Sequence, residues 1–102
     1  MAATLEHEEF ARHVNTTFRV RVNETETVEA QLVGVSELLL SPRQERFAII
    51  FRAPKEPFLG QGQRSIEHDQ MGDFSLFMVP IGQDEKGTDY EAVFNRLVKK
   101  SG

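Results

Sequence analysis

The stretch IEHDQMGDF, residues 66–74, gathers the side chains of this sequence that are best suited to acid–base chemistry. His68 is followed directly by Asp69, and Asp73 comes four positions later. Histidine changes its charge near neutral pH, and carboxylates positioned beside a reacting group can take up or release a proton. A small enzyme that uses His68 with Asp69 or Asp73 is therefore one hypothesis for function.

A structural interpretation of the same stretch is favoured. Residues 64–68 and 74–79 have the composition of two strands, and Gly72 supplies the left-handed residue that a short hairpin loop needs. In the expected register His68 faces Phe74, and the two aspartates flank the loop at an exposed tip. His68 is then a hydrogen-bonded, semi-buried histidine with a structural role, and aspartate beside glycine is ordinary turn composition.

The remaining residues give no catalytic, cofactor-binding or metal-binding set. His7 and His13 are six positions apart, about 240° around a helix, so they do not share a face. No serine has the context of a strained nucleophile turn, and GQG at 60–62 lacks the rest of a dinucleotide motif. The chain contains no cysteine, which excludes disulfides, thiolate catalysis and cysteine-ligated metals.

Length and composition predict one domain over residues 1–102. Eight phenylalanines, one tyrosine and no tryptophan mean that phenylalanine must supply much of the core. The net charge of −4 is spread without a concentrated basic surface, so we expect no nucleic-acid partner. The N-terminus lacks signal-peptide features and no window is long enough for membrane insertion, which predicts a cytoplasmic protein, or one exported without a cleaved signal.

A short helix is expected from Thr4 to about His13, with a narrow apolar stripe of Leu5, Phe10 and Val14 that docks on another apolar surface. Alternation then predicts a strand over 18–22 and a second over 28–32.

These two strands form a hairpin in which Val22 faces Val28. Residues 36–44, SELLLSPRQ, are expected to be an irregular connection anchored by leucines, because the alternation breaks and a proline follows. Residues 45–52 give a third strand that is buried on both faces.

The segment 53–63, APKEPFLGQGQ, has two prolines and two glycines and is expected to be a loop pinned by Phe58 and Leu59. A β-barrel that recognises a peptide or small ligand near this loop is an alternative function.

The last hairpin is predicted around the polar loop GQDEKG, bounded by Gly82 and Gly87, with a final strand over 90–95. When Met78 faces Ala92, the opposite face of the pair is also apolar. This second apolar face must be covered. We therefore expect a protein partner, or self-association, through three residues of that face: Phe77, Val79 and Val93.

Together these elements predict a mainly β fold, a small antiparallel barrel or roll of about six strands in meander order with one short N-terminal helix.

Three stretches, EEFARHVNTTFRVRV, ERFAIIFRAPKEPFLGQG and IEHDQMGDFSLFMVPIGQDEKGTDYEAVFN, resemble a family of small uncharacterised bacterial proteins known as a domain of unknown function. The resemblance covers roughly residues 9–95 and implies no catalytic role for any residue. It implies a link to genes of tail-collar-type proteins, and hence to tail-like assemblies. The family pattern leads us to expect glycine at position 15, where this chain has asparagine.

The expected function is a non-enzymatic structural or protein-interaction role, as an oligomer or a component of a tail-like or other self-assembled bacterial structure. No cofactor is expected.

Overall fold

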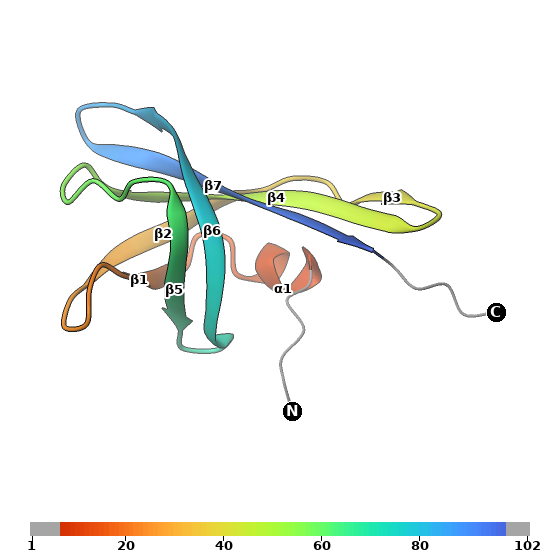
Figure 1. Cartoon of the computed structure of the whole chain (residues 1–102), viewed down its shortest axis with the longest axis horizontal. Coiled ribbons are helices and arrows are strands. Elements are labelled where there is room, and N and C mark those ends of the chain that lie inside the picture. The colour runs from red at the N-terminus through yellow and green to blue at the C-terminus, as the bar shows by residue number, and fades with distance from the viewer. Residues whose placement is uncertain (1–6, 98–102) are drawn as a thin grey trace.

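The computed structural model describes residues 7–97, which form one short helix and a seven-stranded antiparallel sheet (Figure 1). The elements are α1 (His7–Arg12), β1 (Thr17–Arg21), β2 (Thr27–Val35), β3 (Leu39–Ser41), β4 (Gln44–Pro54), β5 (Gly62–His68), β6 (Gly72–Gln83) and β7 (Gly87–Leu97). Six strands close into a barrel and β3 is added at its edge, so the predicted class is confirmed. No helix within 7–97 is long and apolar enough to cross a membrane.

The strand order around the barrel is β1-β2-β4-β7-β6-β5, and β5 returns to β1. The predicted meander order would pair β4 with β5, the next strand along the chain. This part of the prediction is wrong, because β4 and β5 are not neighbours in the barrel. Residues 55–61, which link β4 to β5, contain a proline and a glycine in a loop too long for a tight hairpin. The chain therefore crosses the barrel here, and β4 pairs with β7 instead.

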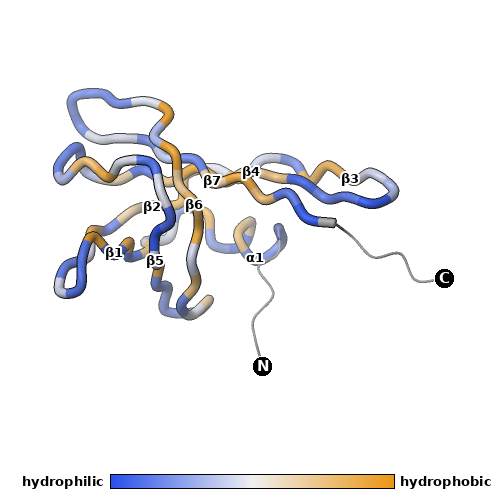
Figure 2. The backbone as a smooth tube through the Cα atoms, in the orientation of Figure 1, coloured by the Kyte–Doolittle hydropathy of each residue, from blue (hydrophilic) through white to orange (hydrophobic). Residues whose placement is uncertain are grey.

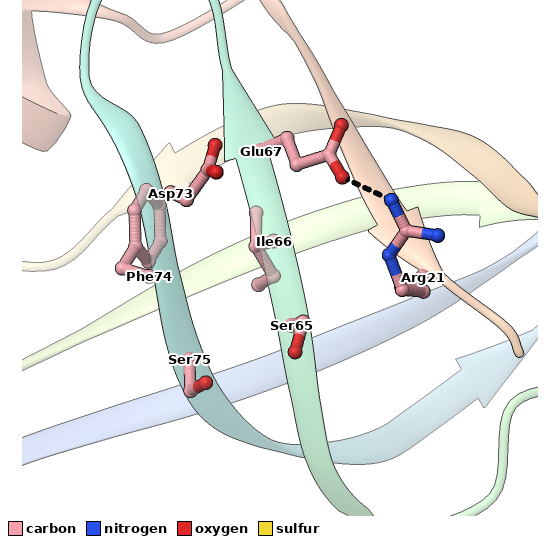
Figure 3. A pocket seen from close by; sticks show the side chains of 7 residues that line it. All are labelled: Arg21, Ser65, Ile66, Glu67, Asp73, Phe74 and Ser75. Carbon is pink, nitrogen blue, oxygen red and sulfur yellow. Dashed lines mark hydrogen bonds and ion pairs between the residues drawn. The ribbon is translucent and has the colours of Figure 1, made fainter. Parts of the chain in front are cut away.

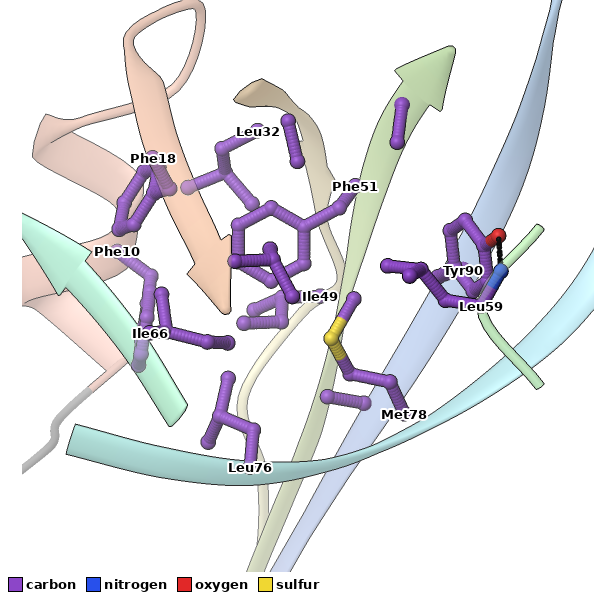
Figure 4. Packing of buried hydrophobic residues seen from close by; sticks show 14 of the residues in the cluster. Phe10, Phe18, Leu32, Ile49, Phe51, Leu59, Ile66, Leu76, Met78 and Tyr90 are labelled. Carbon is purple, nitrogen blue, oxygen red and sulfur yellow. Dashed lines mark hydrogen bonds between the residues drawn. The ribbon is translucent and has the colours of Figure 1, made fainter. Parts of the chain in front are cut away.

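The core lies inside the barrel and comes from the inward positions of each strand (Figure 4). Along β4 the period of two is regular, since Phe47, Ile49 and Phe51 are at most 2% exposed. Phenylalanine supplies much of the buried volume, as the composition predicted. The other fully buried large side chains include Phe10, Phe18, Leu32, Ile66, Met78 and Tyr90.

The helix fills a gap between two strands of the barrel. The ladder between β6 and β7 runs only from Val79, opposite Glu91, to Gln83, opposite Thr88. Beyond Val79 the two strands separate, β6 continuing beside β5 and β7 beside β4 (Figure 1).

Phe10 of α1 enters this gap and is fully buried. Its ring centroid lies 5.3 Å from that of Phe94 on β7, 5.9 Å from Phe74 on β6 and 6.2 Å from Phe47 on β4. The expected docking of the helix is confirmed, and it occurs on the inner side of the sheet. The predicted cap at Thr4 and the apolar contact at Leu5 lie outside the described residues.

The first hairpin is two residues tighter than predicted. Val28 faces Val20 rather than Val22, and the Val22 N–H donates to the Glu26 carbonyl at 2.9 Å. The reason is Asn23, whose Oδ1 accepts the backbone N–H groups two and three residues further on. A shift of two leaves every side chain on its expected face.

The hairpin at 66–74 has the same displacement. Gly72 has the expected left-handed conformation, with φ of 82°, but it faces His68, which was expected to face Phe74. The loop is Asp69, Gln70 and Met71. The turn is therefore present as predicted, and its register is wrong by two.

Asn15 explains the departure from the resembled family. It has a φ of 73°, in the region where glycine is the residue of least strain and asparagine is among the best tolerated alternatives. Its N–H donates to the Leu32 carbonyl at 2.7 Å, which fixes the entry into β1. The expectation of glycine at this position thus has a conformational basis.

Residues 39–41 are a short strand and not the expected irregular connection. A two-residue turn at Pro42 and Arg43 returns the chain so that Ser41 faces Gln44. Leu39 and Leu40 are 58% and 69% exposed and do not anchor the segment, whereas Leu38 packs against the core, as expected of a leucine anchor.

Candidate interaction surface

Apolar side chains are exposed on the outer side of the sheet. We call the outward side of β3, β4 and β7, with the adjoining part of β6, the outer face. Phe77 and Val93, which the sequence indicated, are 50% and 51% exposed, and Val79 is half-buried beside Glu91. Ile81 on β6 adds a further side chain that is 53% exposed. The expected second apolar face therefore exists among the described residues.

The helix does not cover this face, because Phe10 packs against inward residues of β4, β6 and β7. The expected contact of Phe77 with Val93 across a ladder is absent, since the β6–β7 pairing ends at Val79. The predicted pairing of Met78 with Ala92 is also absent, because these residues lie beyond Val79 and Glu91, where β6 and β7 no longer pair. Both of these inner side chains are nevertheless buried.

A shallow groove of about 380 Å³ lies on the outer face between β3 and β7. Ala48 faces Val93 on β7, while Leu39 of β3 faces Arg46, and Figure 2 shows apolar residues along these strands. Arg46 stands at one end of the apolar strip and Glu91 at the other. The groove is lined by Ser36, Leu39, Arg46, Phe47, Ala48, Glu91 and Val93. Such a strip, apolar at its centre and charged at its ends, fits the anatomy of a protein interface.

A second, polar depression of about 400 Å³ lies over β1, β5 and β6 (Figure 3). Arg21 donates to Glu67 at 2.5 Å, and hydrogen bonds from Arg21 and then Arg19 hold the pKa of the Glu67 carboxyl below its ordinary value. Asp73 faces Glu67 across the strands. The depression is lined by Arg21, Ser65, Ile66, Glu67, Asp73, Phe74 and Ser75. Within it, Arg21 and Glu67 already neutralise each other.

His68 is 6% exposed and both of its ring nitrogens are occupied. Nδ1 accepts the N–H groups of Gln70 and Met71, each at 3.1 Å, which fixes the three-residue loop one residue earlier than the sequence pattern predicts. Nε2 lies 3.0 Å from Thr16 Oγ1, whose proton goes to the His13 carbonyl, so Nε2–H donates to Thr16. His68 is hydrogen-bonded as expected, and it is buried where the sequence predicted a semi-buried position.

Neither candidate aspartate meets the His68 ring. Asp69 has a side chain that is 85% exposed and pairs with Arg19 at 3.1 Å, while Asp73 is exposed beside Glu67. Burial, and then the nearby His13, lower the pKa of His68 below its ordinary value of 6.5. A neutral imidazole with no free nitrogen is suited to holding a turn.

The other two histidines tie the helix to the barrel. His7 Nε2 donates to the Ser36 carbonyl at 2.7 Å, and His13 Nε2 lies 2.8 Å from Gln70 Oε1 in the β5–β6 loop, while its Nδ1 donates to the Glu9 carbonyl within the helical segment. They face different neighbours, as the helical spacing predicted. Across residues 7–97 no group of three histidine, cysteine, aspartate or glutamate side chains could hold a metal ion.

The loop over 55–61 is held by one of the two residues named for it. Leu59 is 3% exposed and its N–H donates to the hydroxyl of buried Tyr90 at 2.8 Å. Phe58 is 56% exposed and only lies near the Tyr90 ring, so its expected anchoring role is wrong.

The two glycines of the last hairpin have different surroundings. Gly87 opens β7 opposite Pro54, and a Cβ there would lie 2.6 Å from the Ala53 carbonyl oxygen. Gly82 lies at the irregularity in β6, with no atom within 4 Å of an added Cβ. Of these two glycines, therefore, only Gly87 is required by the close approach of a neighbouring strand's backbone.

Sequence reasoning missed half of the groove. Leu39 falls in the segment 36–44 that is expected to be irregular, and no sequence motif singles out Arg46. By contrast, carboxylates pair with Arg12, Arg19, Arg21 and Arg52. The signal that could have found the groove is the alternation of Arg46 with the small Ala48 on the outward side of β4.

Comparison with known proteins gives one match. The model of a family described as a domain of unknown function (DUF6916) matches residues 5–94. No curated protein and no solved structure matches the chain. That description assigns no activity to the family.

Proposed function

We propose a non-enzymatic role for this chain, which belongs to the DUF6916 family of domains of unknown function. It is a structural or protein-interaction protein that binds another protein surface through the outer face. The observation that carries the proposal is the exposure of Phe77, Ile81 and Val93 on one side of the sheet, while the helix is used on the other. Adjoining apolar side chains of this kind mark interaction sites in soluble proteins.

The setting that we propose is a tail-like or other self-assembled bacterial structure. In such an assembly each subunit must present a rigid surface, and side chains on strands of a barrel are held more firmly than those on loops. Val79 and Val93 both lie on strands with ladder partners. The satisfied ring of His68 supports the non-enzymatic part of the proposal, since its nitrogens are used within the turn.

Site-specific photo-cross-linking in the cells that naturally make the protein tests this proposal. A photoreactive residue is placed at Phe77 or Val93 on the outer face, and at Glu24 in the exposed β1–β2 loop as a control. We expect covalent protein adducts from the two face positions and none from the control. Val79→Lys in the same chain should reduce adduct formation, because it puts a charge at the centre of the surface. Equal adduct yields at all three positions would refute the proposal.

A further inference from the structure

Two opposite charges flank the apolar centre of the outer face. The register places Ala48 beside Val93, with Arg46 two residues before Ala48 on β4 and Glu91 two residues before Val93 on β7. Because the strands are antiparallel, the two charges lie on opposite sides of this apolar row. Arg46 is exposed and Glu91 is half-buried.

Neither charge has an ion-pair partner in the part of the chain that the structure describes. They cannot pair with each other, because four residues along a strand separate them by about 13 Å. Arg19, Arg21 and Arg52, by contrast, each hold a carboxylate within their own chain. The outer face therefore offers one unpaired cation and one unpaired anion at a fixed spacing.

From this spacing we infer that the occupant of the outer face is a second copy of the same chain, packed face to face about a two-fold axis. The axis lies parallel to the sheet and perpendicular to the line from Arg46 to Glu91. It brings Arg46 of each copy over Glu91 of the other, and Val93 and Ala48 of both copies to the centre. The inference rests on the proposed function and names the partner.

A two-fold interface of this kind uses the same patch on both copies, so one complementary pair of charges is satisfied twice. The line from Arg46 to Glu91 is inclined by about 20° to the strands, given the usual strand spacing and rise, so the strands of the two copies cross at about 40°. That angle is near the about 30° at which two sheets pack in an aligned sandwich. The half-buried Glu91 carboxylate gains a cation when its surroundings lose water.

Sedimentation of charge-swapped variants tests the pairing. Wild type should sediment as a dimer of the 11.6 kDa chain and dissociate on dilution. Arg46→Glu alone and Glu91→Arg alone should each raise the dissociation constant at least about tenfold, because like charges then face each other twice. The double variant, Arg46→Glu with Glu91→Arg, restores both pairs in reversed order. It should return the dissociation constant to within about threefold of wild type.

Matched controls change the same charges elsewhere. Arg43→Glu in the β3–β4 turn and Glu85→Arg in the β6–β7 loop are both exposed and lie off the outer face, and they should leave the dissociation constant unchanged. Circular dichroism of every variant establishes that it is folded.

Two results would overturn the inference. The first is a double variant as weak as the single variants, since no facing pair is then restored. The second is a wild type that stays monomeric at every concentration. If position 93 still cross-links to a different protein in that case, the proposed function stands and only the second copy is excluded. If cross-linking at 93 equals the control, both fail.

Discussion

His68 and Thr16 are joined by a hydrogen bond of 3.0 Å between the imidazole Nε2 and the threonine Oγ1, which links the β5–β6 turn to the residue preceding β1. Since Nδ1 accepts two N–H groups of the turn, the ring is held in its neutral form. Burial is the main reason that the pKa of His68 is lowered in the folded chain.

Stability should therefore fall as the medium becomes acidic. Below the ordinary pKa of 6.5 the unfolded chain binds a proton at His68 that the folded chain still excludes, so the free energy of unfolding decreases until the pH reaches the lowered folded pKa. Urea unfolding at a series of pH values between about 7.5 and 5 measures this decrease, above the range where carboxylates protonate.

The control for this prediction is His68→Asn, whose Oδ1 can still accept the N–H groups of the turn. This variant should lose less stability than wild type over the same range. A pH dependence as steep in His68→Asn as in wild type would assign the decrease to another group.

Gly72→Val should lower the free energy of unfolding by about 1 kcal/mol or more, because a β-branched residue resists a φ of 82°. No atom lies within 4 Å of an added Cβ, so the loss reports the backbone conformation alone. Asp69→Asn removes only an exposed ion pair with Arg19 and should change stability much less. Equal melting temperatures for wild type and Gly72→Val would contradict the turn.

Gly87→Ala should destabilise the chain by about 1–3 kcal/mol, because the new methyl group meets the Ala53 carbonyl oxygen and the two strands must move apart. Gly82→Ala adds the same group in open space and serves as the control. Thermal unfolding of the two variants side by side makes the comparison. A larger loss in Gly82→Ala would mean that the close approach at 87 is not the deciding contact.

Phe10→Ala should cost about 3–5 kcal/mol of stability, because it empties the space between β6 and β7. Arg12→Ala, on the exposed side of the same helix, removes one ion pair with Glu9 and should cost less than about 1 kcal/mol. Chemical denaturation measures both. Similar losses in the two variants would show that the helix contributes through its own formation and not through the buried ring.

The sequence predicted the fold class and the face of nearly every strand residue, because alternation has a period of two. It missed two hairpin registers for one reason. In the first hairpin Asn23 Oδ1 binds backbone N–H groups of the loop and shortens it by two residues. In the second hairpin His68 Nδ1 binds backbone N–H groups of a loop that keeps the expected three residues but begins one residue earlier. Loop composition indicates that a turn is present, but the acceptor geometry appears only when the chain is folded.

The outer face was predicted in part. Phe77, Val79 and Val93 follow from apolar residues on both sides of one hairpin. Arg46 and Glu91 do not, because their relation depends on the pairing of β4 with β7, and strand pairing across 40 or more residues leaves no mark on local periodicity. The crossing between β4 and β5 was missed on the same ground.

The strand order also has a consequence for folding kinetics. Each half of the chain can form its own hairpins quickly, but the barrel closes only when β5 meets β1 and β7 meets β4. These ladders join residues as far apart in sequence as Arg19 and Glu67, so the entropy of closing long loops opposes them until most of the chain is in place. The high contact order that results is typical of domains that fold in milliseconds to seconds.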